Sequence, residues 1–279
     1  MLPMNTNAPL TLVLGATGKT GSRVVRRLAD RGLPVRAGSR AATPAFDWED
    51  RSTWAAALEG VDAVYISYYP DLAVPAAPEA VEALARVAAD AGVRRAVLLS
   101  GRGEREAQRS EELVRAVLPQ TTIVRCAWFN QNFSESFFRE MVMSGALAVP
   151  VGDVREPFVD VDDIADIAVE ALIDERHAGQ LYELTGPRML TFAEAAAEIA
   201  AASGRDVQVV RISEEEFVAG LEAEGVPPDV VALIRFLFTE VLDGRNEYLS
   251  DGVERALGRP ARDFADFARG AAANGAWSA

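Results

Sequence analysis

Residues 11–21 read TLVLGATGKTG, a short apolar run that leads through a glycine-rich turn into a helical pattern. Gly15, Gly18 and Gly21 are spaced three residues apart. Such a turn between a strand and a helix lets the backbone approach a phosphate, and the amides at the start of the helix then face the anion. A plain connector would not need three glycines, so we expect a pyrophosphate to bind at this turn.

The same run argues against the phosphate loop of ATPases, which places four residues between its first glycine and a Gly-Lys-Ser/Thr triplet. Gly18, Lys19 and Thr20 supply the triplet, but only two residues separate it from Gly15. The turn is therefore interpreted as a dinucleotide-binding turn, although the usual fingerprint spaces its glycines by two residues and then by three.

Apolar runs and helical patterns alternate through the first half of the chain, which is typical of a parallel sheet covered by helices. Strands are predicted at residues 10–14, 35–38, 63–67, 96–100 and 122–126, and helices between them at residues 19–31, 52–58, 78–91 and 104–118. The predicted fold class is α/β, a doubly wound (Rossmann) parallel sheet with a small, mostly helical C-terminal lobe.

The pattern becomes irregular after residue 128. We expect a nucleotide-binding Rossmann domain over residues 1–155 and a C-terminal substrate or cap lobe over residues 156–279, with residues 156–186 returning to the Rossmann sheet. Thr191 and Glu194 have the spacing of a capping box before an alanine-rich helix. The aspartates of DVDDIAD (160–166) lead into a helix, so we interpret them as helix-start carboxylates and not as a metal site.

The composition narrows the classes of partner and of chemistry. A net charge of −14 opposes the phosphates of nucleic acid and the anionic surface of a membrane, so neither partner is expected. His177 is the single histidine and is placed in a surface turn, which argues against a multi-histidine metal site; no metal is predicted. The lone Cys126 is interpreted as a buried thiol. We expect a cytoplasmic protein, because no signal peptide or membrane span is present, and either a monomer or a homodimer.

The end of the second predicted strand indicates which dinucleotide is bound. An acidic residue there would bind the free ribose 2′-hydroxyl of NAD. The chain instead reads Gly38-Ser39-Arg40, and Arg40 offers a guanidinium to a 2′-phosphate. We predict a preference for NADPH over NADH; the alternative is that Arg40 is a solvated turn residue.

Several motifs resemble one known family. They are LVLGATGKTG, VRAGSR, FDWED, VDAVYISYYPDL, GVRRAVLLSGRGE, WFNQNFSE, PFVDVDDIADIAVEAL and YELTGPRMLTFAEAAAEIAAASGR, and together they run from about residue 11 to about residue 205. The chain resembles the NmrA-like branch of the atypical short-chain dehydrogenase/reductases. That family contains NADPH-dependent quinone reductases, ergot-alkaloid dehydrogenases and catalytically silent NADP-sensing regulators.

The resemblance implies a set of residues that bind NADP(H). Gly15, Thr17, Gly18, Lys19, Thr20 and Gly21 would line the pyrophosphate, Ser39 and Arg40 the 2′-phosphate, Asp47 and Trp48 the adenine, Tyr68, Tyr69 and Pro70 the nicotinamide-side ribose, and Ser100 and Gly101 the nicotinamide. The alternative for Trp48 is a packing residue, and Tyr65 is expected in the core.

One feature departs from the larger superfamily, whose members use a tyrosine followed by a lysine four residues later to pass a proton. Lys19 is the only lysine of this chain and lies in the glycine turn, so the pair is missing. Hydride transfer to an acceptor that needs little acid catalysis remains possible: a quinone, a conjugated enone, or an imine or iminium. Ser100 and Tyr68 are the candidate catalytic residues, as groups that hold the proton source.

We predict a small, flat, largely apolar substrate, bound beyond the carboxyl ends of the strands. The candidate pocket residues are Tyr69, Arg102, Trp128, Phe129, Asn130, Gln131 and Phe133. The alternative to a reductase is a regulatory protein that senses NADP without turnover and acts through a protein partner. The missing Tyr-Lys pair favours this alternative, and the cofactor turn with its aromatic and amide residues favours the enzyme.

Overall fold

The computed structural model describes residues 9–278, which form two compact units. The first unit contains the chain up to Cys126 together with Asp162–Leu184 and Gly252–Gly258. The second contains Ala127–Val161, Thr185–Asp251 and the chain from Arg259 onward. The chain therefore leaves the first unit about thirty residues before the domain boundary that the sequence suggested at residue 155, because residues 127–161 contact distant segments of the second unit.

The first unit is built on a parallel sheet of six strands in the order β2-β1-β3-β4-β5-β7. The strands are β1 (Thr11–Leu14), β2 (Val35–Gly38), β3 (Ala63–Ile66), β4 (Arg95–Gly101), β5 (Thr122–Cys126) and β7 (Leu181–Leu184). β1 and β3 are buried along their whole length, as expected for strands covered on both faces. The predicted doubly wound sheet is confirmed, and Tyr65 lies in its core as expected.

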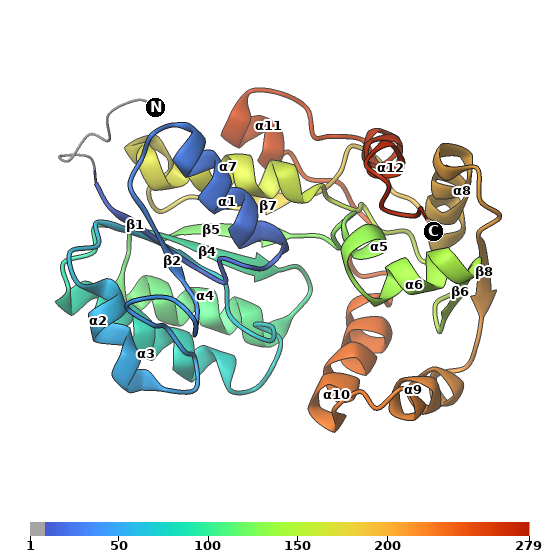
Figure 1. Cartoon of the computed structure of the whole chain (residues 1–279), viewed down its shortest axis with the longest axis horizontal. Coiled ribbons are helices and arrows are strands. Elements are labelled where there is room, and N and C mark those ends of the chain that lie inside the picture. Colours follow the sequence, from blue (N-terminus) through green and yellow to red (C-terminus); the bar gives the residue numbers. More distant parts are fainter. Residues whose placement is uncertain (1–8, 279) are drawn as a thin grey trace. The chain divides into compact units, whose positions relative to one another are not determined.

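Helices cover both faces of this sheet. They are α1 (Lys19–Asp30), η1 (Arg51–Thr53), α2 (Trp54–Leu58), α3 (Ala77–Asp90), α4 (Arg105–Val117), α7 (Val161–Ile173), η2 (Glu175–His177) and α11 (Gly252–Leu257). α1 and α7 lie on one face, and α2, α3 and α4 lie on the other (Figure 1). β7 pairs with β5, so the chain returns to the sheet within residues 156–186.

Two acidic residues of α7 bind a neighbouring helix. Arg27 of α1 donates to Asp162 at 2.6 Å and to Asp166 at 2.7 Å. Both carboxylates therefore join α1 to α7, and Asp162, which lies in the first turn, also complements the start of α7. His177 is 4% exposed, not in a surface turn as the sequence suggested, because it packs beneath β7 with its Nδ1 2.8 Å from the hydroxyl of Tyr182.

The second unit packs helices around an aromatic core. Its elements are α5 (Asn132–Glu135), α6 (Phe137–Ser144), β6 (Ala146–Val149), α8 (Phe192–Ser203), β8 (Gln208–Arg211), α9 (Glu214–Ala223), α10 (Pro228–Phe236), the π-helical η3 (Leu237–Val241) and α12 (Phe264–Ala273). β6 and β8 form a two-stranded parallel sheet that the sequence did not predict. The capping box of Thr191 and Glu194 is confirmed at the start of α8.

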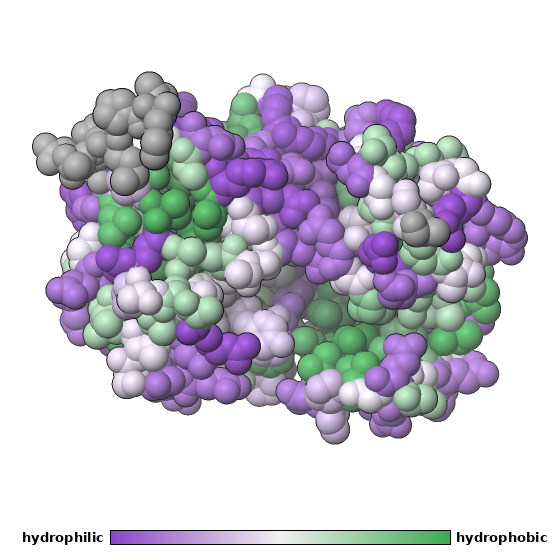
Figure 2. Space-filling view, in the orientation of Figure 1, coloured by the Kyte–Doolittle hydropathy of each residue, from purple (hydrophilic) through white to green (hydrophobic). Residues whose placement is uncertain are grey.

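The visible surface is mostly hydrophilic, and apolar residues gather on the part of the second unit that α10 occupies (Figures 1 and 2). Leu233, Ile234 and Phe236 of α10 are half-buried. Within residues 9–278, no helix is long and apolar enough to cross a membrane.

Candidate functional site

The glycine turn joins β1 to α1, and each of its three glycines has a different structural role. Gly15 has φ +66°, a left-handed conformation that L side chains rarely adopt. The amide of Gly18 donates to the carbonyl of Gly15 at 2.9 Å and closes the turn. A Cβ on Gly21 would lie 2.1 Å from that same carbonyl oxygen, so only glycine lets α1 approach the turn this closely.

The start of α1 is suited to an anion. Gly18 occupies the N-cap position and provides no side chain to accept from the first amides of the helix, and the first turn contains no acidic residue. These amides and the helix dipole therefore favour a bound negative charge. Thr17 is exposed in the turn, Thr20 is buried and Lys19 is half-buried, so Thr17 and Lys19 are the polar side chains of the turn with surface to offer.

The segment after β2 contains the residues expected at a 2′-phosphate. Gly38 is needed for packing, because a Cβ there would lie 2.7 Å from Cδ2 of Leu14. The carbonyl of Ser39 accepts from the amides of Ala42 and Phe46 and shapes the following loop. Arg40 is exposed, and it forms no hydrogen bond or ion pair with another residue of the described chain. Its guanidinium is available to an anionic ligand.

An aromatic cluster follows this loop. The ring of Trp48 lies 5.1 Å from Phe46, 5.8 Å from Trp54 and 4.8 Å from Tyr68, measured between ring centroids. The indole of Trp54 donates to the backbone oxygen of Asp47 at 2.7 Å. Trp48 therefore packs against its neighbours, as the alternative interpretation held, while remaining half-buried. Sequence reasoning missed Phe46 and Trp54, whose role depends on this contact.

The loop after β3 contains the residues predicted beside the nicotinamide-side ribose. Tyr69 is 74% exposed and Pro70 is exposed as well. Tyr68 is half-buried against Trp48, and burial raises the pKa of its phenol above the ordinary value, with the nearby Glu49 acting in the same direction. A higher pKa makes Tyr68 a weaker proton donor at neutral pH.

Ser100, the second candidate for catalysis, is part of a buried polar network. Its hydroxyl donates to Oε1 of Glu111 at 2.6 Å. Arg125 binds the same carboxylate through both oxygens, with Nε 2.9 Å from Oε1 and Nη2 2.5 Å from Oε2. The hydroxyl proton of Ser100 is therefore directed into the protein. Glu111 was missed at the sequence level, since only the folded sheet places it beneath Ser100.

Arg102 was predicted to line a substrate pocket, but the structure places it in a buried ion pair. It is 3% exposed, and its Nε lies 3.2 Å from Oε1 of Glu183. Its amide donates to the carbonyl of Cys126, which holds the chain against the end of β5. Arg102 is therefore a buried ion-pair residue at the end of the sheet, where the unpredicted Glu183 of β7 neutralises it.

The remaining pocket candidates lie in the second unit, and two of them have structural roles. Phe133 is fully buried among Phe138, Phe158 and Phe264, so it belongs to the core and not to a pocket wall. Gln131 is buried, donates to Asp160 at 3.0 Å and accepts from the amide of Val161 at 2.9 Å. The nitrogen and the oxygen of its side-chain amide are thereby both occupied within the second unit.

The other three candidates keep some capacity for a ligand. Trp128 and Phe129 are half-buried. Asn130 is fully buried, and neither side-chain atom of its amide has a hydrogen-bond partner. Of the predicted WFNQNF cluster, Trp128, Phe129 and Asn130 therefore remain candidates for substrate contact.

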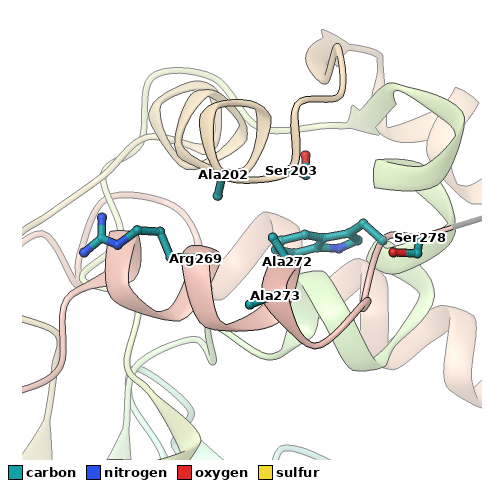
Figure 3. Close-up of a pocket in the computed structure, with 7 residues that line it drawn as sticks. Ala202, Ser203, Arg269, Ala272, Ala273 and Ser278 are labelled. Atoms are coloured by element: carbon teal, nitrogen blue, oxygen red, sulfur yellow. The ribbon is translucent and has the colours of Figure 1, made fainter.

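A separate pocket of about 320 Å³ lies between α8 and α12 of the second unit. Figure 3 shows Ala202 and Ser203 on one side and Arg269, Ala272 and Ala273 on the other. Arg269 is its only charged lining residue and already pairs with Asp266. This pocket shares no residue with the predicted sites. Among the described residues, no group of three or more His, Cys, Asp or Glu side chains could hold a metal ion.

The sequence profile of the NmrA-like family matches residues 9–264, which is most of the chain. The chain belongs to the NmrA-like family. The motifs that suggested this membership extend from the glycine turn to α8, and they span both units.

This NmrA-like chain is similar to several curated proteins over almost its whole length. It is 34% identical to an uncharacterized oxidoreductase, YesF, of Bacillus subtilis, covering 94% of this chain and 95% of that protein. It is 32% identical to the NAD(P)H azoreductase of Xenophilus azovorans, with coverage of 95% and 98%. It is 31% identical to the agroclavine dehydrogenase of Claviceps fusiformis, with coverage of 92% and 95%.

Solved structures share the fold at lower identity. The NADPH complex of the NADPH-dependent quinone oxidoreductase QOR2 of Escherichia coli matches with a TM-score of 0.73 at 21% identity, covering 92% of this chain and 98% of that one. The negative transcriptional regulator Nmra, in complex with NAD, matches with a TM-score of 0.70 at 16% identity and coverage of 97% and 98%. The same fold thus occurs in an enzyme and in a regulator, so the fold alone does not distinguish them.

Proposed function

We propose that this protein is an NADPH-dependent reductase that transfers hydride to a small, flat, largely apolar acceptor: a quinone, a conjugated enone, or an imine or iminium. The observation that carries the proposal is the glycine turn of residues 15–21, whose packing leaves the uncapped start of α1 open to an anion. The names of the NAD(P)H azoreductase and agroclavine dehydrogenase relatives support an oxidoreductase chemistry.

The residues of the first unit fit the parts of NADPH. The amides at the start of α1 would hold the pyrophosphate, and the exposed Arg40 would hold the 2′-phosphate. The nicotinamide of the bound cofactor supplies the hydride. The protein then orients the acceptor and excludes water.

Titration with NADPH and NADH tests the cofactor part of the proposal. A charge-assisted hydrogen bond contributes about 1.5–3 kcal/mol, so Arg40→Ala should weaken NADPH binding by about 10- to 100-fold. NADH binding should change little, because NADH lacks the 2′-phosphate. Arg26→Ala is a matched control that removes an exposed arginine from α1. Equal affinities of the wild type for NADPH and NADH would contradict the proposed preference.

Turnover separates the reductase from the second candidate, a regulator that senses NADP through a protein partner. The missing Tyr-Lys pair favours this second candidate, since Lys19 is the single lysine. NADPH oxidation should be followed by absorbance across quinones, enones, azo compounds and cyclic imines. Oxidation with at least one acceptor supports the reductase, whereas tight NADP binding without any oxidation supports the regulator.

A further inference from the structure

Glu104 has an unusual conformation for its position in the chain. It is the N-cap residue of α4, where a polar side chain normally accepts from the first amides of the helix. The carboxyl group of Glu104 makes no such bond. The side chain is instead turned inward, and the residue is only 8% exposed.

The buried carboxyl group lies directly against Gly101, the last residue of β4. A Cβ on Gly101 would lie 2.2 Å from the carboxyl carbon and from both oxygens of Glu104, so any other residue at position 101 would expel this group. Oε2 of Glu104 is buried and has no hydrogen-bond partner. A buried ionised carboxylate without a partner is costly, so this environment favours the protonated acid.

The charges around Glu104 act in the same direction. Burial is the main cause that raises its pKa well above the ordinary value, and the carboxylates of Asp71 and Glu111 raise it further. Arg102 and Arg125 of this buried network are engaged elsewhere, because Arg102 faces Glu183 and Arg125 binds Glu111. The neighbouring thiol at the end of β5, Cys126, also has a raised pKa through burial, so it does not supply a negative charge.

The position of Glu104 in the fold connects it to the proposed reaction. Gly101 pairs with Cys126 in the register of β4 and β5, and Asp71 follows β3 after a short loop. These residues lie at the carboxyl ends of three adjacent strands, the edge at which parallel α/β sheets bind their ligands. Gly101, predicted beside the nicotinamide, is therefore the immediate neighbour of a buried acid.

We propose that Glu104 is the proton donor of this enzyme, a role that rests on the proposed reductase function. An acceptor that takes up a hydride at one atom takes up the proton of Glu104 at its oxygen or nitrogen. NADPH is oxidised, the acceptor is reduced by two electrons, and Glu104 becomes a carboxylate that regains its proton from solvent. Glu104 thus supplies the acid that the missing Tyr-Lys pair provides in the larger superfamily.

The chemistry of the acceptors provides an internal comparison. A quinone needs a hydride and a proton, whereas a cyclic iminium already carries positive charge and needs only the hydride. Glu104→Gln keeps the size and shape of the side chain but cannot donate an acidic proton. We therefore expect this variant to lose quinone reduction by about 100-fold or more, the contribution typical of general acid catalysis, while iminium reduction changes less than about threefold.

Three further measurements distinguish proton donation from a structural role. The wild-type kcat for quinone should fall as pH rises and Glu104 loses its proton, and this limb should be absent from Glu104→Gln. NADPH affinity should be the same in both proteins. In the cofactor-free protein, infrared difference spectra of wild type against Glu104→Gln should contain the band of a protonated carboxyl group at neutral pH. Glu112→Gln removes an exposed carboxylate from the same helix and is the matched control.

Each result decides the matter. Loss of quinone reduction together with loss of the pH limb supports the proposal. Unchanged quinone reduction, equal losses on quinone and iminium, or no protonated carboxyl band overturns it while leaving the reductase function intact. If none of the tested acceptors supports NADPH oxidation by the wild type, the reductase function is overturned. The role of Glu104 is then overturned with it.

Discussion

Replacing Gly21 with alanine should push the start of α1 away from the turn after β1. The new Cβ would lie 2.1 Å from the carbonyl oxygen of Gly15, whereas real Cβ atoms essentially never approach within 3.0 Å. The backbone must yield by about 0.9 Å, the difference between 3.0 and 2.1 Å, because no flexible side chain is involved. Overpacking costs about 1–3 kcal/mol, which exceeds the gain of about 0.5–1 kcal/mol for alanine over glycine in a helix.

Taken at the middle of each range, these terms leave a net loss of about 1 kcal/mol in the free energy of unfolding of Gly21→Ala, measured by urea denaturation. NADPH affinity should fall as well, because the amides at the start of α1 move. Gly220→Ala in α9 is the control, since no heavy atom lies within 4 Å of its Cβ position. That variant should gain about 0.5–1 kcal/mol and bind NADPH normally. A Gly21→Ala protein with wild-type stability and wild-type NADPH affinity would refute the reasoning.

Three other variants test the buried charges. Arg125→Met removes the arginine that binds both oxygens of the buried Glu111 carboxylate and should cost about 3–5 kcal/mol in urea denaturation; a loss below about 1 kcal/mol would contradict this. Because the pKa of Glu104 is raised, above pH 4.5 the unfolded chain releases a proton that the folded chain keeps. Wild-type stability should therefore fall as the pH rises, by at most about 1.4 kcal/mol per pH unit, and Glu104→Gln should lack this loss. Burial lowers the pKa of His177, so below pH 6.5 the unfolded chain binds a proton that the folded chain does not bind. The stability of the wild type should therefore decrease as the pH is lowered below 6.5, and parallel stability profiles for wild type and His177→Gln would contradict this prediction.

The sheet and the glycine turn were predictable because their signals are local. β2 and β5 occupy the predicted residues 35–38 and 122–126, since apolar runs bounded by turn residues determine them. The sheet of β6 and β8 was not predicted, because about sixty residues separate its strands and β8 is largely exposed, so no apolar run marks it. The change of unit after Cys126 escaped prediction for the same reason, as it depends on contacts between distant segments.

The candidate site divides in the same way. Gly15, Gly18 and Gly21 carry a recognisable spacing, and their packing in the structure accounts for it. The burial of Arg102 against Glu183 and of Phe133 in the second core depends on tertiary partners that no spacing reveals. Glu104 was missed because an N-cap glutamate normally indicates a solvated helix start. The glycine three residues before it was the available signal, since Gly101 makes room for the carboxyl group.

The interleaving of the two units along the chain has a consequence for protein engineering. The backbone passes from one unit to the other five times, after Cys126, Val161, Leu184, Asp251 and Gly258. A fragment that ends at residue 126 or 155 would lack β7, α7 and α11, and would leave the edge of β5 unpaired. Exchanging the second unit for that of a relative with a different acceptor therefore requires five matched splice points, whereas changing single residues such as Trp128 or Asn130 requires none.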